Sequence, residues 1–298
     1  MIQNNQINLK KDKKTTWLRV LVTGFALFIA GIVILVLTGN PNLFPTVVMI
    51  GNFLIPVTFV VFFYERRHWS KLSLPTTALS FFYGGVLGVL AASILEPIFI
   101  RQLNLFNMFV VGLIEEFAKI LGVLIIARHW RHNSEMDGLI LGAAAGMGFA
   151  ALESSGYAFN AFLLSRGSLS ITVIVTLMRG ILASVGHGTW TAILASMLFR
   201  ESGEKHFRLN WKVLGAYFTV VSLHGLWDSA PSLLAAIVSP GLDVFIGQSF
   251  IGVIGLFILW RRWREARRLQ SEQQQLLLKK LMSRTLPFSL LHFEGKNQ

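Results

Sequence analysis

The segment that decides the fold runs from Gly112 to Ile120 and reads Gly-Leu-Ile-Glu-Glu-Phe-Ala-Lys-Ile. It lies inside an apolar run from Phe106 to Ala127 that is long enough to span a bilayer. A charged side chain at the membrane centre costs about 2.5–3.5 kcal/mol even on lenient insertion scales. On a helix, Lys119 is three residues from Glu116 and four from Glu115, so one ammonium group can face both carboxylates. One lysine cannot neutralise two glutamates, so we expect further polar groups from neighbouring helices.

The composition is that of a polytopic membrane protein. Of the 298 residues, 53% are hydrophobic and 14% are charged, whereas soluble proteins carry about 25% charged residues. The chain has no cysteine, which excludes disulfides and thiolate metal sites. Its net charge of +12 could indicate nucleic-acid binding, but the basic residues follow the membrane topology, so no nucleic-acid partner is expected. The first apolar segment has full length and lacks a small-residue cleavage site, which indicates a signal anchor.

Hydropathy in windows of about 19 residues predicts an all-α, polytopic transmembrane bundle of about eight spans. The predicted spans are 17–38, 43–64, 75–100, 106–127, 136–164, 170–199, 210–236 and 242–260. The expected parts of the chain are a cytoplasmic basic arm (1–16), a membrane domain (17–260) with its catalytic core at 106–236, and a cytoplasmic basic amphipathic tail (261–298).

The basic residues predict the orientation. Of the 27 Lys and Arg residues, 23 fall in the arm, the tail and the loops of one side, and only Arg101 and Arg166 fall on the other. The positive-inside rule therefore predicts a multi-pass protein of the cell membrane with both termini in the cytoplasm. The basic tail is expected to bind anionic lipid at the cytoplasmic face. Because the loops are short, any chemistry must take place at or within the membrane.

Polar residues recur on the next three predicted spans. Glu153 lies seven residues after Gly146, the last of three glycines spaced by four, so it should point into a tightly packed interior. The following span carries Arg179 and His187, and Arg179 is expected to be a counter-ion for Glu153 or Glu116.

The seventh span carries His224 and Asp228 one helical turn apart. With a rise of 1.5 Å per residue, the ionisable groups of spans four to seven lie about 14–18 Å from a membrane surface, near the midplane. Glu96, near the outer end of span 75–100, is expected to reach the interface instead. Ionisable residues at such depth are functional by default.

These segments resemble the PrsW family of glutamic-type intramembrane proteases, which shares a superfamily with the CAAX prenyl endopeptidases and bacteriocin self-immunity proteins. The resemblance covers residues 106–236, in four consecutive predicted spans. Two positions depart from the pattern: Ser154, where the family typically has Asn, and Asp228, where related enzymes often have Asn. The matching motifs are Glu115-Glu116-Phe117-Ala118-Lys119, Asp137-Gly138-Leu139-Ile140-Leu141-Gly142-Ala143, Gly148-Phe149-Ala150-Ala151-Leu152-Glu153, His187-Gly188-Thr189-Trp190 and His224-Gly225-Leu226-Trp227-Asp228.

The resemblance implies an intramembrane endopeptidase that acts on a single-pass membrane protein, as in site-1 cleavage of a membrane-anchored anti-sigma factor. Amide hydrolysis by water needs a general base, stabilisation of the oxyanion and an acid for the leaving amine. We expect Glu115 to be the base with help from His187, and Lys119 to hold Glu116. Glu115 and Glu116 are 100° apart on the helix, so these two roles could be exchanged.

The remaining predicted site residues complete this arrangement. His224 and Asp228 are expected on the oxyanion side, with Asp228 donating only when protonated, and Glu153 is expected to position water. No cofactor is expected. A catalytic zinc ion is the alternative, with Glu116, Glu153, His187 and His224 as its ligands. Against zinc, the two histidines lie on different spans, and the ammonium group of Lys119 would repel a dication.

Two other classes of protein fit part of the pattern. A proton- or ion-coupled transporter would also carry ionisable groups at the midplane, but it would usually show an internal repeat, and none is apparent. A non-catalytic membrane receptor or scaffold on the same fold would keep the helices without the chemistry.

Overall fold

The computed structural model describes residues 15–67, 70–102, 104–128, 134–202 and 206–285, which form helices and no strand. The predicted all-α bundle is confirmed, and the bounds of the predicted spans agree within two residues, except that the last helix is longer. The predicted arm as far as residue 14 and the tail beyond residue 285 lie outside the described residues. The helices are α1 (Thr16–Thr38), the short 3-10 helix η1 (Pro41–Leu43), α2 (Phe44–Glu65), α3 (Leu74–Phe99), α4 (Leu105–Ala127), α5 (Glu135–Leu164), α6 (Leu169–Glu201), α7 (Trp211–Leu234) and α8 (Leu242–Thr285).

Six segments of the described chain are long and apolar enough to cross a membrane: α1, η1 with α2, α3, α5, α6 and α8. The protein is therefore a membrane protein with several spans. Helices α4 and α7 do not meet the same criterion, and they carry the Glu-Glu-x-x-Lys and His-x-x-x-Asp motifs. Helix α4 carries three charged residues, Glu115, Glu116 and Lys119, close together. The count of eight spans therefore stays a prediction.

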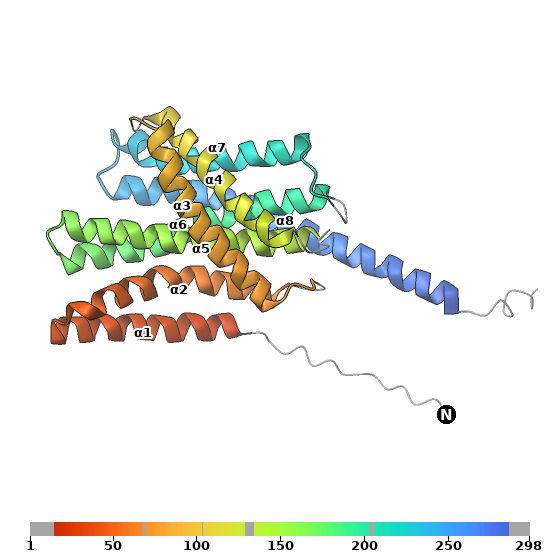
Figure 1. Ribbon diagram of the computed structural model, residues 1–298, viewed down its shortest axis with the longest axis horizontal. Coiled ribbons are helices and arrows are strands. Elements are labelled where there is room, and N and C mark those ends of the chain that lie inside the picture. The colour runs from red at the N-terminus through yellow and green to blue at the C-terminus, as the bar shows by residue number, and fades with distance from the viewer. Residues whose placement is uncertain (1–14, 68–69, 103, 129–133, 203–205, 286–298) are drawn as a thin grey trace, which may run out of the picture.

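Successive helices run in alternating directions, which puts the loops after α1, α5 and α7 at one end of the bundle (Figure 1). Helix α1 begins and α8 ends at the opposite end (Figure 1). The structure thus has the same-side arrangement of the two helical ends that the eight-span topology requires. Which end faces the cytoplasm stays a prediction from the basic residues.

Helix α5 lies at the centre of the bundle, and every residue from Glu135 to Ala151 is buried. On one side, a Cβ atom at Gly146 would overlap the backbone carbonyl oxygen of His187 on α6. On another side, a Cβ atom at Gly148 would overlap the carbonyl oxygen of Phe81 on α3. Glycine at these positions lets α5 approach both neighbours closely. This packing brings Glu153 of α5 and His187 of α6 into contact.

Short polar side chains mark where four helices begin. Ser73, Asn104, Ser168 and Asn210 each accept a hydrogen bond from a backbone N–H of the first turn of α3, α4, α6 and α7, respectively. Such caps satisfy N–H groups that have no partner within the helix. They fix the start of the helices that carry most of the candidate site residues.

Helix α8 continues without a break through the predicted boundary at residue 260. Where it leaves the bundle, Arg262 contacts Glu135 at 2.5 Å and donates to the Ser196 hydroxyl at 3.1 Å. Arg200 of α6 contacts Glu265 of α8 at 2.5 Å. These contacts join α8 to the start of α5 and the end of α6.

Candidate active site

Four helices, α4 to α7, bring the predicted site residues into one connected network. The network runs through contacts between ionisable side chains from Asp228 to Arg179. Its centre is deeply buried: Glu116 and Lys119 are 0% exposed, and His224 is 1% exposed. In order along the network, its members are Asp228, His224, Glu115 and Glu116, Lys119, His187, Glu153 and Arg179.

Lys119 is the hub of the network. Its Nζ atom lies 3.0 Å from Glu115 Oε2, 2.8 Å from Glu116 Oε1 and 2.9 Å from His187 Nδ1. It also lies 4.0 Å from the centre of the Phe149 ring, where a cation is attracted to the aromatic face. The expected pairing of one ammonium with both glutamates is therefore present, and the lysine holds His187 as well.

Glu116 lies at the back of the network. Its Oε2 accepts a hydrogen bond from the Thr191 hydroxyl at 2.9 Å, and its Oε1 lies 3.2 Å from His224 Nδ1. With Lys119, these contacts use both of its oxygens. Glu116 is thereby placed to orient Lys119 and His224.

The contacts of His187 determine its tautomer. An ammonium group can only donate, so Nδ1 accepts from Lys119. The ring proton is then on Nε2, which lies 3.1 Å from Glu153 Oε2 and donates to it. Arg179 completes this side: it donates to Glu153 at 2.7 Å and stacks over the Tyr157 ring at 3.7 Å. Arg179 is thus the counter-ion of Glu153, one of the two predicted possibilities.

His224 stands between acidic groups. Its Nε2 lies 3.4 Å from Asp228 Oδ2 and 3.5 Å from Glu115 Oε2, and its Nδ1 faces Glu116. The ring is fixed by Trp190, whose ring centre lies 4.7 Å away. Its Nε2 side therefore faces Glu115 and Asp228 in a fixed orientation.

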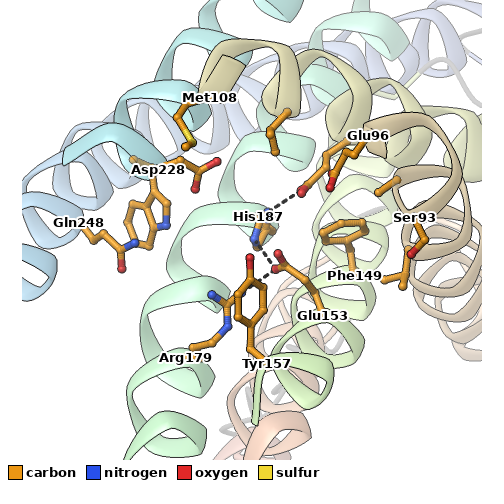
Figure 2. Close-up of a pocket in the computed structure, with 15 residues that line it drawn as sticks. Ser93, Glu96, Met108, Phe149, Glu153, Tyr157, Arg179, His187, Asp228 and Gln248 are labelled. Carbon is orange, nitrogen blue, oxygen red and sulfur yellow. Dashed lines mark hydrogen bonds and ion pairs between the residues drawn. The ribbon is translucent and has the colours of Figure 1, made fainter. Parts of the chain in front are cut away.

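A cavity of about 390 Å³ borders the network. Figure 2 shows Glu153, Tyr157, Arg179 and His187 around it, with Asp228 and Gln248 on one wall and Ser93 and Glu96 on the opposite wall. Its lining comes from the parts of α3 to α8 nearest the loops after α3, α5 and α7. The cavity therefore lies in the half of the bundle next to these loops, the side predicted to face away from the cytoplasm.

The two adjacent glutamates differ in their access to this cavity. Glu115 belongs to its lining, and Glu116, Lys119 and His224 do not. Only Glu115 of the pair can therefore touch a molecule in the cavity.

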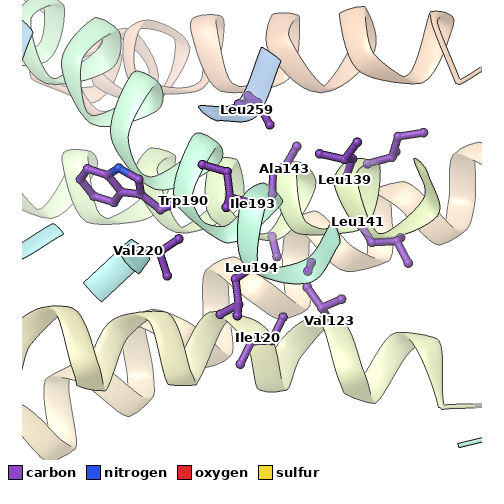
Figure 3. Packing of buried hydrophobic residues seen from close by; sticks show 14 of the residues in the cluster. Ile120, Val123, Leu139, Leu141, Ala143, Trp190, Ile193, Leu194, Val220 and Leu259 are labelled. Atoms are coloured by element: carbon purple, nitrogen blue, oxygen red, sulfur yellow. The ribbon is translucent and has the colours of Figure 1, made fainter. Parts of the chain in front are cut away.

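The opposite half of the bundle is filled by a hydrophobic cluster. Figure 3 shows Trp190, Ile193 and Leu194 of α6 near Ile120 and Val123 of α4, with residues of α5 beside them. Each of these five side chains is at most 8% exposed. This packing separates the polar network from the end of the bundle where α8 leaves.

Comparison with known proteins adds the family. A family model described as "PrsW family intramembrane metalloprotease" matches residues 73–261, more than half of the chain. The chain belongs to the PrsW family. Protease PrsW from Halalkalibacterium halodurans is 28% identical over 176 residues, which cover 56% of this chain and 75% of that protein. No solved structure matches the chain significantly. PrsW membership makes the chain a member of an intramembrane protease family, as the motifs implied.

The family description names a metalloprotease, so we asked which side chains of this chain could bind a metal ion. Ligand atoms of Glu115, His187 and His224 lie within 4.8 Å of one another, and two histidines with one carboxylate are a donor set that catalytic zinc accepts. By residue type and spacing, this group could hold a metal ion. It differs from the predicted ligand set, because Glu115 takes the place expected for Glu116 and Glu153.

Lys119 opposes a metal at that place. Its ammonium group is hydrogen-bonded to two of the three donor groups, Glu115 Oε2 and His187 Nδ1. A dication bound to the same atoms would lie within a few ångströms of this positive charge and would be repelled strongly at low dielectric. A metal ion at these three residues would therefore require the Lys119 ammonium group to move away from Glu115 and His187.

Three contributors to the site were not predicted. Thr191 bonds Glu116, and the Trp190 ring packs on His224. Glu96, expected at the interface, instead borders the cavity and is half-buried. Thr191 and Trp190 lie within four residues of His187 on the same helix. This spacing could have indicated that they lie beside the site.

Proposed function

We propose that this chain hydrolyses a peptide bond of a membrane-anchored protein with water activated by Glu115 and without a bound metal. The observation that carries the proposal is the position of Glu115. This carboxylate borders the cavity, lies between His187 and His224, and is held by Lys119. The protease activity of the named relative supports the same reaction class.

The reaction needs one base and one donor for the oxyanion. Glu115 accepts a proton from water as the water oxygen forms a bond to the carbonyl carbon of the substrate. The carbonyl oxygen then carries negative charge, and a proton shared between His224 Nε2 and Asp228 provides the donor that stabilises it. The C–N bond breaks as Glu115 returns its proton to the leaving amine.

The other network members hold these groups in position. Lys119 keeps Glu115 next to His187, and Glu116 with Thr191 fixes Lys119 and the His224 ring. The Glu153–Arg179 pair orients His187 through its Nε2 proton. Pre-oriented groups of this kind lower the barrier because they need not reorganise during the reaction.

Metal independence is a direct test of this mechanism. The purified protein is expected to contain no stoichiometric zinc and to keep its activity after treatment with EDTA or 1,10-phenanthroline, because Lys119 supplies the positive charge beside Glu115. Metal analysis and a cleavage assay check this. Stoichiometric zinc, loss of activity on chelation and recovery with added zinc would make Glu115, His187 and His224 ligands instead.

The place of cleavage follows from the place of the cavity. A carbonyl within a regular transmembrane helix is already hydrogen-bonded, and lipid offers no replacement partner. We therefore expect cleavage where the helix of a single-pass substrate unwinds near its extracytoplasmic end. A membrane-anchored anti-sigma factor is a substrate of this kind. Mass spectrometry of the products should locate the cut there, and Gly or Pro beside the scissile bond should speed it. Uniformly slower cleavage with Gly or Pro, together with faster cleavage with helix-stabilising Leu, would contradict this expectation.

A further inference from the structure

Several buried polar side chains of the described residues have no hydrogen-bond partner, and three of them lie on adjacent helices: Asn52 on α2, Ser154 on α5 and Thr176 on α6. Asn52 is 0% exposed, and Ser154 and Thr176 are each 1% exposed. The unpartnered atoms are both heteroatoms of the Asn52 amide, Ser154 Oγ and Thr176 Oγ1. Buried polar groups in proteins nearly always have a partner, which is often an ordered water molecule.

Contacts between α2 and α6 place Asn52 and Thr176 at the same level. A Cβ atom at Gly51, the residue before Asn52, would lie 2.5 Å from Thr176 Cγ2. A Cβ atom at Gly180, one turn after Thr176, would lie 3.9 Å from Asn52 Cα. The two helices are therefore in close contact at this pair of residues.

Ser154 reaches the same level from α5. It lies three residues after Ala151 and seven after Met147, so the three share one face of the helix. Ala151 and Met147 belong to a hydrophobic cluster that includes Phe53 of α2, the residue after Asn52. Because α2 and α5 run in opposite directions, Ser154 follows Ala151 toward the level of Asn52 (Figure 1).

The two hydroxyl groups are not bonded to their own helices. Serine and threonine in helices commonly donate to the carbonyl four residues earlier. Ser155 and Thr172 do so here, at 2.8 and 2.9 Å. Ser154, the residue before Ser155, and Thr176, four residues after Thr172, make no such hydrogen bond. Their hydroxyl groups are left available to a common partner between the helices.

We propose that Asn52, Ser154 and Thr176 form a binding site for internal water between α2, α5 and α6. Water is the ligand that matches the chemistry, because the set contains donors as well as acceptors. The Asn52 amide nitrogen can only donate, so a cation would leave it unsatisfied. Arg179, three residues after Thr176, would also repel a cation.

The site adjoins the Glu153–Arg179 pair along α5 and α6. Ser154 follows Glu153 on α5, and Arg179 has a buried Nε atom that also lacks a partner. Water at this place could accept a hydrogen bond from the Arg179 Nε–H group and so hydrate the ion pair. The consequence for catalysis, a hydrated and correctly placed Glu153, rests on the proposed function. The binding of water does not.

Hydroxyl-radical footprinting tests the site without a substrate, because radicals formed from bound water oxidise adjacent buried side chains. Phe28 is the reporter: it is 1% exposed, and its ring lies 2.7 Å from where a Gly51 Cβ would stand. Phe199 is the matched control, 0% exposed in the hydrophobic cluster. In the wild-type protein Phe28 should be oxidised several-fold faster than Phe199. Equal, slow oxidation of both would overturn the proposal.

Apolar replacement and ion exchange complete the test. The triple variant Asn52→Leu, Ser154→Ala, Thr176→Val should lose the fast oxidation of Phe28 and should show a several-fold lower kcat with unchanged KM. Lost oxidation with unchanged kcat would make the water purely structural and refute its link to catalysis. If wild-type oxidation or thermal stability depends on Na⁺ rather than choline in the buffer, a cation occupies the site and the inference is wrong.

Discussion

Replacing Glu115 by glutamine is expected to lower kcat by about 10²–10⁴-fold, the contribution typical of a positioned general base. The amide keeps the shape of the side chain and can still bond Lys119 through its oxygen, but it cannot take a proton from water. Glu115 is 4% exposed and is the member of the Glu115–Glu116 pair that borders the cavity. Single-turnover cleavage of a single-pass substrate by purified protein in detergent measures the loss.

Glu201→Gln is the matched control for this experiment. Glu201 ends α6 at the far end of the bundle, where it contacts Lys212 at 3.2 Å. This variant should cleave at the wild-type rate, and both variants should elute as folded protein. If Glu115→Gln retained cleavage within an order of magnitude of wild type, a role for Glu115 as the base would be untenable. If Glu116→Gln alone abolished cleavage in the same assay, the two glutamates would have to exchange roles.

How much of this site the sequence can predict depends on whether a contact lies within one helix. The pairing of Lys119 with both glutamates follows from spacings of three and four residues, which helix geometry fixes. The bond from Lys119 to His187 joins residues 68 positions apart and depends on how α4 packs on α6. The choice between Glu115 and Glu116 at the cavity depends on the rotation of α4 about its axis, which no spacing within α4 determines.

For the fold, too, features within one segment can be predicted from the sequence, and features that depend on packing between helices cannot. The bounds of the spans follow from hydropathy, and helix α4, bounded by Leu105 and Ala127, agrees with the predicted 106–127. The end of α8 could not be predicted from hydropathy, because beyond residue 260 the helix is polar and leaves the apolar part of the bundle. Its course there is fixed by contacts of Arg262 with α5 and α6.

Replacing Lys119 by methionine should destabilise the protein by about 3–5 kcal/mol, the usual cost of removing one partner of a buried ion pair. Lys119 is 0% exposed, and its loss leaves two buried carboxylates, Glu115 and Glu116, without their cation. Equilibrium unfolding in mixed micelles measures the change. Lys212→Met is the control, because Lys212 is 68% exposed in its pair with Glu201, and such surface pairs contribute about 0–1 kcal/mol.

A second substitution separates charge from packing in this result. Adding Glu116→Gln to Lys119→Met removes one negative charge together with the positive one, so it should recover part of the lost stability. It should not recover cleavage, because Lys119 also holds Glu115 and His187 in place. A double variant as unstable as Lys119→Met would show that the unpaired charge of Glu116 is not the source of the lost stability. Lys119→Met at wild-type stability would mean that the two glutamates need no cation, and the argument that Lys119 opposes a metal ion would lose its basis.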